Sequence, residues 1–85
     1  MAIKTYLYNN VEKSLKRLPR IITERFYKTL DLLTNNPLAG MPLKGTLKGY
    51  RKYRIGDYRI VYKYQPKEKA LIIYRIESRQ SAYKN

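Results

Sequence analysis

Basic side chains alternate with tyrosines along residues 50–64, which read YRKYRIGDYRIVYKY. A Gly-Asp pair stands between two runs that are rich in tyrosine and β-branched residues, and this pattern is typical of a tight two-residue hairpin turn. Because successive side chains of a strand point to opposite faces, such a hairpin predicts that Lys52, Arg54 and Arg59 project from one face. Arginine forks bind phosphate oxygens two at a time, so this face is suited to a phosphate-bearing ligand.

The turn also predicts the pairing of the two strands. If Ile55 and Tyr58 flank the turn, Arg54 lies opposite Arg59, where like charges repel each other. The fold gains nothing from this pairing unless an anion sits above it, and the alternative is a solvated face whose charges splay into water. We expect an apolar face with Tyr53, Ile55, Tyr58, Ile60 and Tyr62, and a cationic face with Tyr50, Lys52, Arg54, Arg59, Val61 and Lys63.

The composition favours an anionic partner. The 85-residue chain contains 19 Lys and Arg residues against 6 Asp and Glu residues, which gives a net charge of +13. Such a field attracts phosphates, acidic proteins or anionic membranes. No apolar stretch is long enough to span a bilayer, and residues 1–10 lack the apolar run of a signal peptide. We therefore expect a cytoplasmic protein that is not a membrane protein.

The residue types that are missing restrict the chemistry further. The sequence contains no histidine and no cysteine. The usual transition-metal ligands, the common general base at neutral pH and the thiol nucleophile are therefore all lacking. Any catalysis must run on Lys, Arg, Tyr or lone carboxylates, and we expect neither a metal nor another cofactor. Without disulfides, the stability of so short a chain must come from a single core.

Hydrophobic periodicity places one strand and two helices before the hairpin. Apolar and polar side chains alternate over residues 3–8, which favours a strand. Apolar residues recur at helical spacing over residues 11–18 and again over residues 22–34, with Pro19 separating the two helices. Residues 38–49 contain several glycines and prolines and are expected to form a connector.

The last strand is expected over residues 70–77, after a polar loop. With a five-residue loop, Arg75 lies beside Arg59 on the cationic face. A four-residue loop would bury Arg75 without a partner, which is costly for a charge, so we favour the longer loop. The other residues of this strand would then be Leu71, Ile73 and Glu77 on the cationic face, and Ile72, Tyr74 and Ile76 in the core.

The predicted elements define the fold class. Residues 1–85 are expected to form a single α+β domain in which a helical hairpin packs on one face of a small, mainly antiparallel sheet. The order of elements is β-α-α-β-β-β. This arrangement leaves the cationic face of the sheet open, and the tail that follows the last strand would bring Arg79 and Tyr83 to it.

An open cationic face with tyrosines nearby suits single-stranded nucleic acid, because unpaired bases stack on aromatic rings. A ribonuclease needs more than a binding protein. It needs a base for the 2′-hydroxyl, positive charge to stabilise the pentavalent phosphorane and an acid for the leaving 5′-oxygen. Lys and Tyr side chains are the candidates for the proton transfers, and the arginines are the candidates for charge stabilisation. Further contacts with RNA are expected from Lys44, Lys48, Arg51, Lys63 and Arg75.

The sequence also resembles a known family. The stretch LKGYRKYRIGDYRIVY at residues 47–62, followed by a strand and by RQSAY at residues 79–83, is similar to the RelE/ParE superfamily of toxins. The order of elements matches as well, so the resemblance covers essentially the whole chain. The resemblance to the RelE branch implies a ribosome-dependent endoribonuclease that cleaves mRNA without a metal and leaves a 2′,3′-cyclic phosphate. It also implies an acidic antitoxin that wraps the toxin in a hetero-oligomer.

Carried over by motif, the resemblance places the catalytic positions at Lys52, Arg54, Arg59, Arg79 and Tyr83. Some RelE nucleases have a second lysine where Arg54 stands here, and arginine is a poor proton carrier. ParE-type members share the fold but inhibit DNA gyrase, and they generally lack the lysine and the terminal tyrosine. Lys52 and Tyr83 therefore favour the RelE branch. The alternatives are a gyrase inhibitor of the ParE type and a nucleic-acid-binding domain without catalysis.

Overall fold

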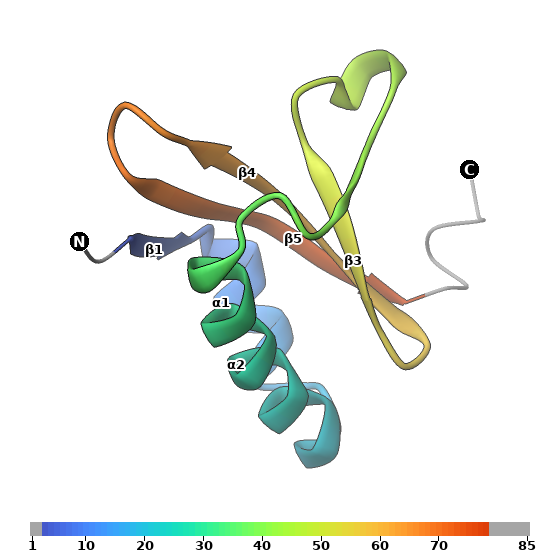
Figure 1. The fold of residues 1–85 in the computed structure, drawn as a ribbon. Helices are drawn as coiled ribbons and strands as arrows, with labels where there is room; N and C mark the ends of the chain where they lie inside the picture. The colour runs from blue at the N-terminus through green and yellow to red at the C-terminus, as the bar shows by residue number, and fades with distance from the viewer. Residues whose placement is uncertain (1–2, 79–85) are drawn as a thin grey trace.

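The computed structural model describes residues 3–78, which form two α-helices and one five-stranded sheet (Figure 1). The strand order is β1-β5-β4-β3-β2, with β1 parallel to β5 and every other pair antiparallel. This confirms the predicted α+β class and the mainly antiparallel sheet. No helix in the described part of the chain is long and apolar enough to cross a membrane. The elements are β1 (Lys4–Leu7), α1 (Asn9–Leu15), α2 (Arg20–Asn35), β2 (Met41–Pro42), the 3-10 helix η1 (Gly45–Leu47), β3 (Arg51–Ile55), β4 (Tyr58–Gln65) and β5 (Ala70–Ser78).

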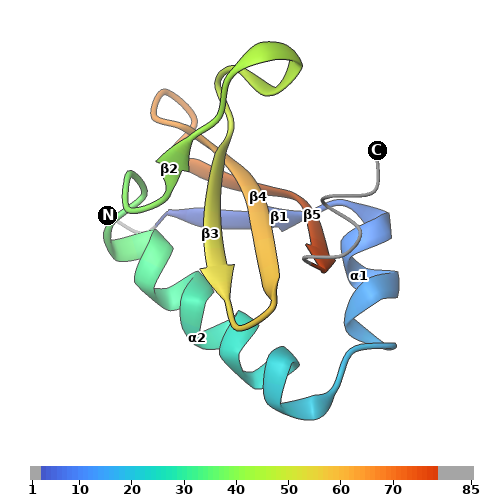
Figure 2. The same ribbon diagram turned by 90° about the vertical axis from the view of Figure 1, so that its right-hand side faces the viewer.

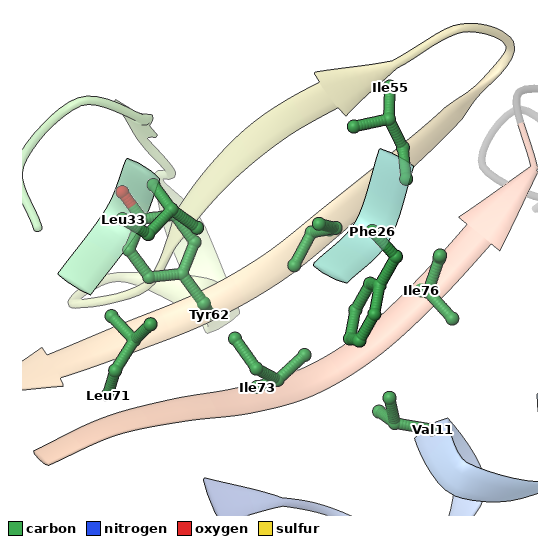
Figure 3. Packing of buried hydrophobic residues seen from close by; sticks show 9 residues of the cluster. Val11, Phe26, Leu33, Ile55, Tyr62, Leu71, Ile73 and Ile76 are labelled. Carbon is green, nitrogen blue, oxygen red and sulfur yellow. The ribbon is translucent and has the colours of Figure 1, made fainter. Parts of the chain in front are cut away.

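Both helices lie on the same side of the sheet, as the helical periodicity predicted (Figures 1 and 2). Pro19 is the N-cap of α2, where its missing N–H and its fixed φ cost nothing. Helix α2 turns Phe26, Thr29 and Leu33 inward, while α1 contributes Val11. Phe26, Leu33 and Val11 meet the side chains of the sheet in one core, as Figure 3 shows. The fully buried side chains of this core are Val11, Phe26, Leu33, Ile60, Tyr62, Leu71 and Ile73.

The β3–β4 hairpin has the predicted register. Ile55 pairs with Tyr58, and Arg54 pairs with Arg59. Gly56 adopts a φ of +61°, a left-handed conformation that glycine reaches without strain. The local Gly-Asp signal was therefore sufficient to predict which hairpin residues face the helices.

The predicted register of β5 was wrong in its first half. The loop from Pro66 to Lys69 has four residues, because Gln65 pairs with Ala70. Leu71 and Ile73 therefore belong to the core, where both are fully buried, and not to the cationic face. The residues between and after them, Ile72 and Tyr74, are correspondingly excluded from the core cluster.

A β-bulge restores the predicted arrangement in the second half of β5. Val61 pairs with Arg75 and Tyr62 pairs with Ile73, so Tyr74 is an extra residue that shifts the register. After this shift Ile76 faces the core, and Arg75 and Glu77 face away from the helices. The two alternatives considered for the loop thus each describe one half of the strand, because a bulge changes the face on which all later residues lie.

Tyr62 fixes the connector between α2 and β3 to the sheet. Its buried hydroxyl accepts a hydrogen bond from Gly40 N at 2.8 Å and donates one to Pro37 O at 2.8 Å. A Cβ atom at position 40 would lie 2.7 Å from this hydroxyl and 2.6 Å from Lys52 O, so only glycine fits here. Residues 38–49 were predicted as a connector, and within it residues 41–42 also pair with β3 as the short strand β2.

We predict that Tyr62→Phe lowers the free energy of unfolding by about 1–3 kcal/mol, because the Gly40 N–H and the Pro37 carbonyl lose a buried partner. Chemical denaturation measures this change. Tyr27→Phe is the matched control, since the Tyr27 side chain lies on α2 and is 52% exposed. Equal effects of the two substitutions would contradict the anchoring role of Tyr62.

The cost of Tyr62→Phe should also depend on pH. Burial raises the pKa of the Tyr62 hydroxyl above its ordinary value of 10.0. A raised pKa in the folded state means that the contribution to stability is fully present below pH 10 and is lost as the pH rises through the folded-state pKa. The difference in stability between wild type and Tyr62→Phe should therefore be constant up to about pH 10 and shrink at higher pH.

Candidate functional site

Four basic side chains come together on the face of the sheet that points away from the helices. Lys52 and Arg54 lie on β3, Arg59 on β4 and Arg75 on β5. Cross-strand pairing joins them, since Arg54 is opposite Arg59, and Val61 is flanked by Lys52 on one side and Arg75 on the other. We call these four residues the basic cluster. The hairpin residues of the cluster lie where the alternation of the sequence predicted them.

Glu77 neutralises part of the basic cluster. Its Oε1 accepts a hydrogen bond from Arg59 Nε at 2.6 Å, and its Oε2 lies 3.3 Å from Arg75 Nε in an ion pair without hydrogen-bond geometry. The Glu77 side chain is only 14% exposed, so this carboxylate is poorly screened by solvent. Glu77 is therefore the counter-charge of Arg59 and Arg75, and it comes from β5, which pairs with β4.

This bridge leaves the outer ends of two guanidinium groups for other ligands. Glu77 contacts Arg59 and Arg75 through their Nε atoms. Within residues 3–78, no hydrogen bond involves a terminal nitrogen of either side chain. A guanidinium held in this way can still offer its Nη groups to a phosphate. The sequence contains a signal for the role of Glu77 as a partner of the arginines, because Glu77 follows Arg75 by two positions and so lies on the same face of the strand.

The middle of the face is apolar. Val61 was expected on the cationic face, and its cross-strand partners Lys52 and Arg75 confirm this position. Its side chain is fully buried nonetheless. Long basic side chains can cover apolar surface with their methylene stems while the charged ends stay in solvent. The face is thus a packed surface with charged ends, and not a row of freely solvated lysines and arginines.

The remaining predicted residues fall in several places. Lys63 lies on the same face, with its Nζ 5.4 Å from the centroid of the Tyr50 ring. Lys44 and Lys48 flank η1 in the exposed loop that leads into β3. Arg79 and Tyr83 lie outside the described residues, so their predicted roles remain predictions.

Arg51 does not join this face. It pairs with Tyr62 on the helix-facing side of the sheet, and its Nη1 donates a hydrogen bond to Gly40 O at 2.8 Å. Arg51 thus makes a structural contact with the connector, and its predicted contact with RNA stays a prediction. The reason is strand alternation, which turns Arg51 to the opposite side from Lys52.

A second feature is a groove of about 280 Å³ between α2 and the tip of the hairpin. Arg25 and Lys28, both on α2, supply positive charge to it. Apolar surface comes from Leu32, which is 42% exposed, and from Tyr53 and Ile55. Figure 2 shows the hairpin turn lying beside α2, where this groove is formed. Its mixed lining is complementary to an acidic, amphipathic chain segment.

Two solved structures with the same fold are of toxin–antitoxin complexes. The RelBE2 complex of Mycobacterium tuberculosis contains a chain with a TM-score of 0.83 at 24% identity, aligned over 92% of this chain and 99% of that one. The RelE–RelB complex of Pyrococcus horikoshii contains one with a TM-score of 0.77 at 27% identity, aligned over 93% of this chain and 97% of that one. The fold is therefore the one found in toxins of this class.

Sequence comparison identifies the family. Residues 7–83 match the family described as the ParE toxin of the type II toxin–antitoxin system parDE. The Methanocaldococcus jannaschii protein that carries the name RelE1 is 32% identical, over 100% of this chain and 99% of that protein. The chain belongs to the RelE/ParE superfamily of type II toxin–antitoxin toxins, as its hairpin and tail motifs had indicated.

We predict that Glu77→Gln lowers the free energy of unfolding by about 1–3 kcal/mol, because two half-buried arginines lose their counter-charge. The cost should fall as salt is added, since salt screens the repulsion among the arginines that remain. Denaturation at low and high ionic strength measures both effects. Glu68→Gln is the matched control: it raises the net charge by the same amount, but Glu68 is exposed in the β4–β5 loop. Equal, small effects of the two substitutions would contradict the bridging role of Glu77.

Proposed function

We propose that this toxin is an endoribonuclease that cleaves mRNA on the ribosome without a metal cofactor. The observation that carries the proposal is the basic cluster, in which Glu77 holds Arg59 and Arg75 by their Nε atoms and leaves their terminal nitrogens for a phosphate. The tail motif of RelE-type toxins at Arg79 and Tyr83 adds support. The name of the Methanocaldococcus jannaschii relative points to the same branch. Dependence on the ribosome rests on the resemblance to that branch.

The proposed reaction needs two proton transfers and one site of charge stabilisation. A base takes the proton of the 2′-hydroxyl, and the 2′-oxygen attacks the adjacent phosphorus. The bond from phosphorus to the 5′-oxygen then breaks, the 5′-oxygen receives a proton, and a 2′,3′-cyclic phosphate remains. Arg59 and Arg75 stabilise the charge of the phosphorane, which is the larger contribution to such catalysis. Lys52 and Tyr83 are the candidates for the proton transfers.

Arg54, Arg79, Lys44, Lys48 and Lys63 complete the proposed RNA-binding surface. Arginine stays protonated in proteins, so Arg54 and Arg79 act through charge and hydrogen bonds and not as acids or bases. The lysines around β3 and β4 contact the phosphates of the flanking nucleotides. Such contacts raise affinity without reading the base sequence.

An acidic antitoxin is the proposed partner in the resting state. The related toxin of Pyrococcus horikoshii was solved with RelB bound, and a net charge of +13 favours an acidic protein. The groove beside α2 offers both charge and apolar surface to such a chain. We propose a toxin–antitoxin hetero-oligomer in the cytoplasm, where the mRNA and the ribosome are found.

The alternative is inhibition of DNA gyrase. Its supporting observation is the matching family itself, which is described as ParE toxin. This alternative uses the same fold and the same positive charge but needs no acid–base residues. Lys52 and Tyr83 are the residues that decide between the two functions, since a gyrase inhibitor has no proton to transfer.

We predict that Tyr83→Phe lowers the single-turnover cleavage rate by roughly 10²- to 10⁴-fold, because this substitution removes a proton-transfer or orienting group. Ribosome affinity should hardly change, since the ring and the net charge are kept. Arg59→Ala should lower both rate and affinity, with the larger effect on the rate. Primer extension on a ribosome-bound message measures the rates. Arg20→Ala is the control for charge alone, since the Arg20 side chain is 93% exposed on α2.

The same assay separates the two functions. If the wild type cleaves the message and Tyr83→Phe cleaves it equally fast, the protein is a nuclease whose acid–base group is Lys52 or another residue. If the message stays uncut and supercoiling by gyrase is blocked at a similar toxin concentration, the proposed nuclease function is wrong and gyrase inhibition is supported. In that case Tyr83→Phe should leave the inhibition nearly unchanged.

We predict that salt acts mainly on the association rate of toxin and antitoxin. Long-range attraction between a cation of +13 and an acidic chain accelerates encounter, and salt screens this attraction. The apolar contacts that slow dissociation are less sensitive to salt. Stopped-flow association and dissociation rates at several salt concentrations test this. Equal salt dependence of both rates, or none, would contradict an electrostatically steered encounter.

A further inference from the structure

We propose that Tyr8, Tyr74 and Tyr50 form a stacking surface for the unpaired bases of an RNA strand, next to the basic cluster. The three rings form a row across the sheet. The centroids of Tyr8 and Tyr74 lie 5.2 Å apart, and those of Tyr74 and Tyr50 are also 5.2 Å apart. We call these residues the tyrosine row. None of them belongs to the apolar core cluster of the domain.

The tyrosine row lies on the same side of the sheet as the basic cluster because of the bulge in β5. The extra residue at Tyr74 makes two successive side chains, Tyr74 and Arg75, point away from the helices. A regular strand would have turned one of them into the core. Bulges often redirect side chains in this way next to functional sites. The bulge in β5 thereby places Tyr74 of the tyrosine row next to Arg75, the arginine that forms an ion pair with Glu77.

Positive charge accompanies the rings. Arg75 Cζ lies 5.4 Å from the centroid of the Tyr74 ring, and Lys63 Nζ lies 5.4 Å from that of Tyr50. Each of these cations can contact a phosphate while the neighbouring ring contacts the base of the same or the next nucleotide. Rings beside a cationic track are the usual arrangement for binding single strands, because every base has a face that can stack.

The exposure of the rings agrees with this use. Tyr8 is 45% exposed, and Tyr50 and Tyr74 are partly exposed. Tyr62, by contrast, is fully buried in the core and offers no ring face to a ligand. An acidic peptide would neutralise the charges of Arg75 and Lys63, but its carboxylates do not stack on the three rings. Single-stranded RNA offers phosphates to the cations and bases to the rings, so the tyrosine row favours a nucleic-acid ligand over a protein one.

This inference rests on the proposed function in one respect, since it takes RNA as the ligand. The test therefore uses RNA that cannot be cleaved, namely a short unstructured oligonucleotide with 2′-O-methyl groups. Its matched partner is an oligonucleotide of the same length and charge in which all bases have been removed. Fluorescence anisotropy gives the affinity of the free toxin for each of the two. The ratio of the affinities reports the contribution of the bases alone.

Wild type should bind the strand with bases more tightly than the abasic strand. Tyr74→Leu should weaken binding of the strand with bases by roughly 5- to 100-fold and leave abasic binding nearly unchanged, since one stacking surface is lost without loss of charge. Tyr74→Phe keeps the ring and should bind as the wild type does. Tyr27→Leu, on the exposed surface of α2, should also leave both affinities unchanged.

Equal binding of both strands by wild type would overturn the inference, as would a Tyr74→Leu effect that is the same for both strands. If Tyr74→Leu does not fold, Tyr8→Leu carries the same test at the exposed end of the row. The cleavage assay on the ribosome is read separately. If the toxin cleaves mRNA but its binding does not depend on the bases, only the stacking role of the tyrosine row is wrong. If binding depends on the bases but the toxin does not cleave mRNA, the stacking role is supported and the proposed nuclease function is wrong.

Discussion

The one-residue bulge in β5 is the constraint on which the functional face of this toxin depends. Leu71 and Ile73 must face the helices to complete the core, and in a regular strand Arg75 would follow them inside. The extra residue at Tyr74 reverses the alternation at that point. One irregularity in the ladder therefore completes the core with Ile76 and at the same time places Arg75 and Glu77 on the outer face.

Glu77 explains how so basic a domain tolerates clustered arginines. Arg54 and Arg59 face each other across the hairpin, and such a pair is destabilising by itself. The carboxylate of Glu77 binds the Nε atoms of Arg59 and Arg75 and orients both side chains. Preorganised charge is more effective in catalysis and binding than charge that must be ordered by the ligand. A structural ion pair and a proposed phosphate site are thus parts of one arrangement.

Tyrosine has two different uses in this small domain. Tyr62 is buried, and its hydroxyl ties the Pro37–Gly40 segment to the sheet, which keeps the connector and β2 in place. Tyr8, Tyr50 and Tyr74 instead form a row of rings on the open face. The aromatic ring suits both positions because it combines a large apolar surface with one polar atom. The core and the proposed RNA surface are therefore built from the same residue type on opposite faces of one sheet.

The sequence by itself determined the features that arise from neighbouring residues. The Gly-Asp turn specified the hairpin register, helical spacing specified α1 and α2, and together they predicted that Lys52, Arg54 and Arg59 share a face. Only the tertiary structure decided the register of β5, the bridge from Glu77 and the turn of Arg51 toward the Gly40 carbonyl. These features depend on pairing between strands and on the burial of Leu71 and Ile73. Loop length and alternation allowed two registers for β5, and the free energy of core packing selected a combination of both.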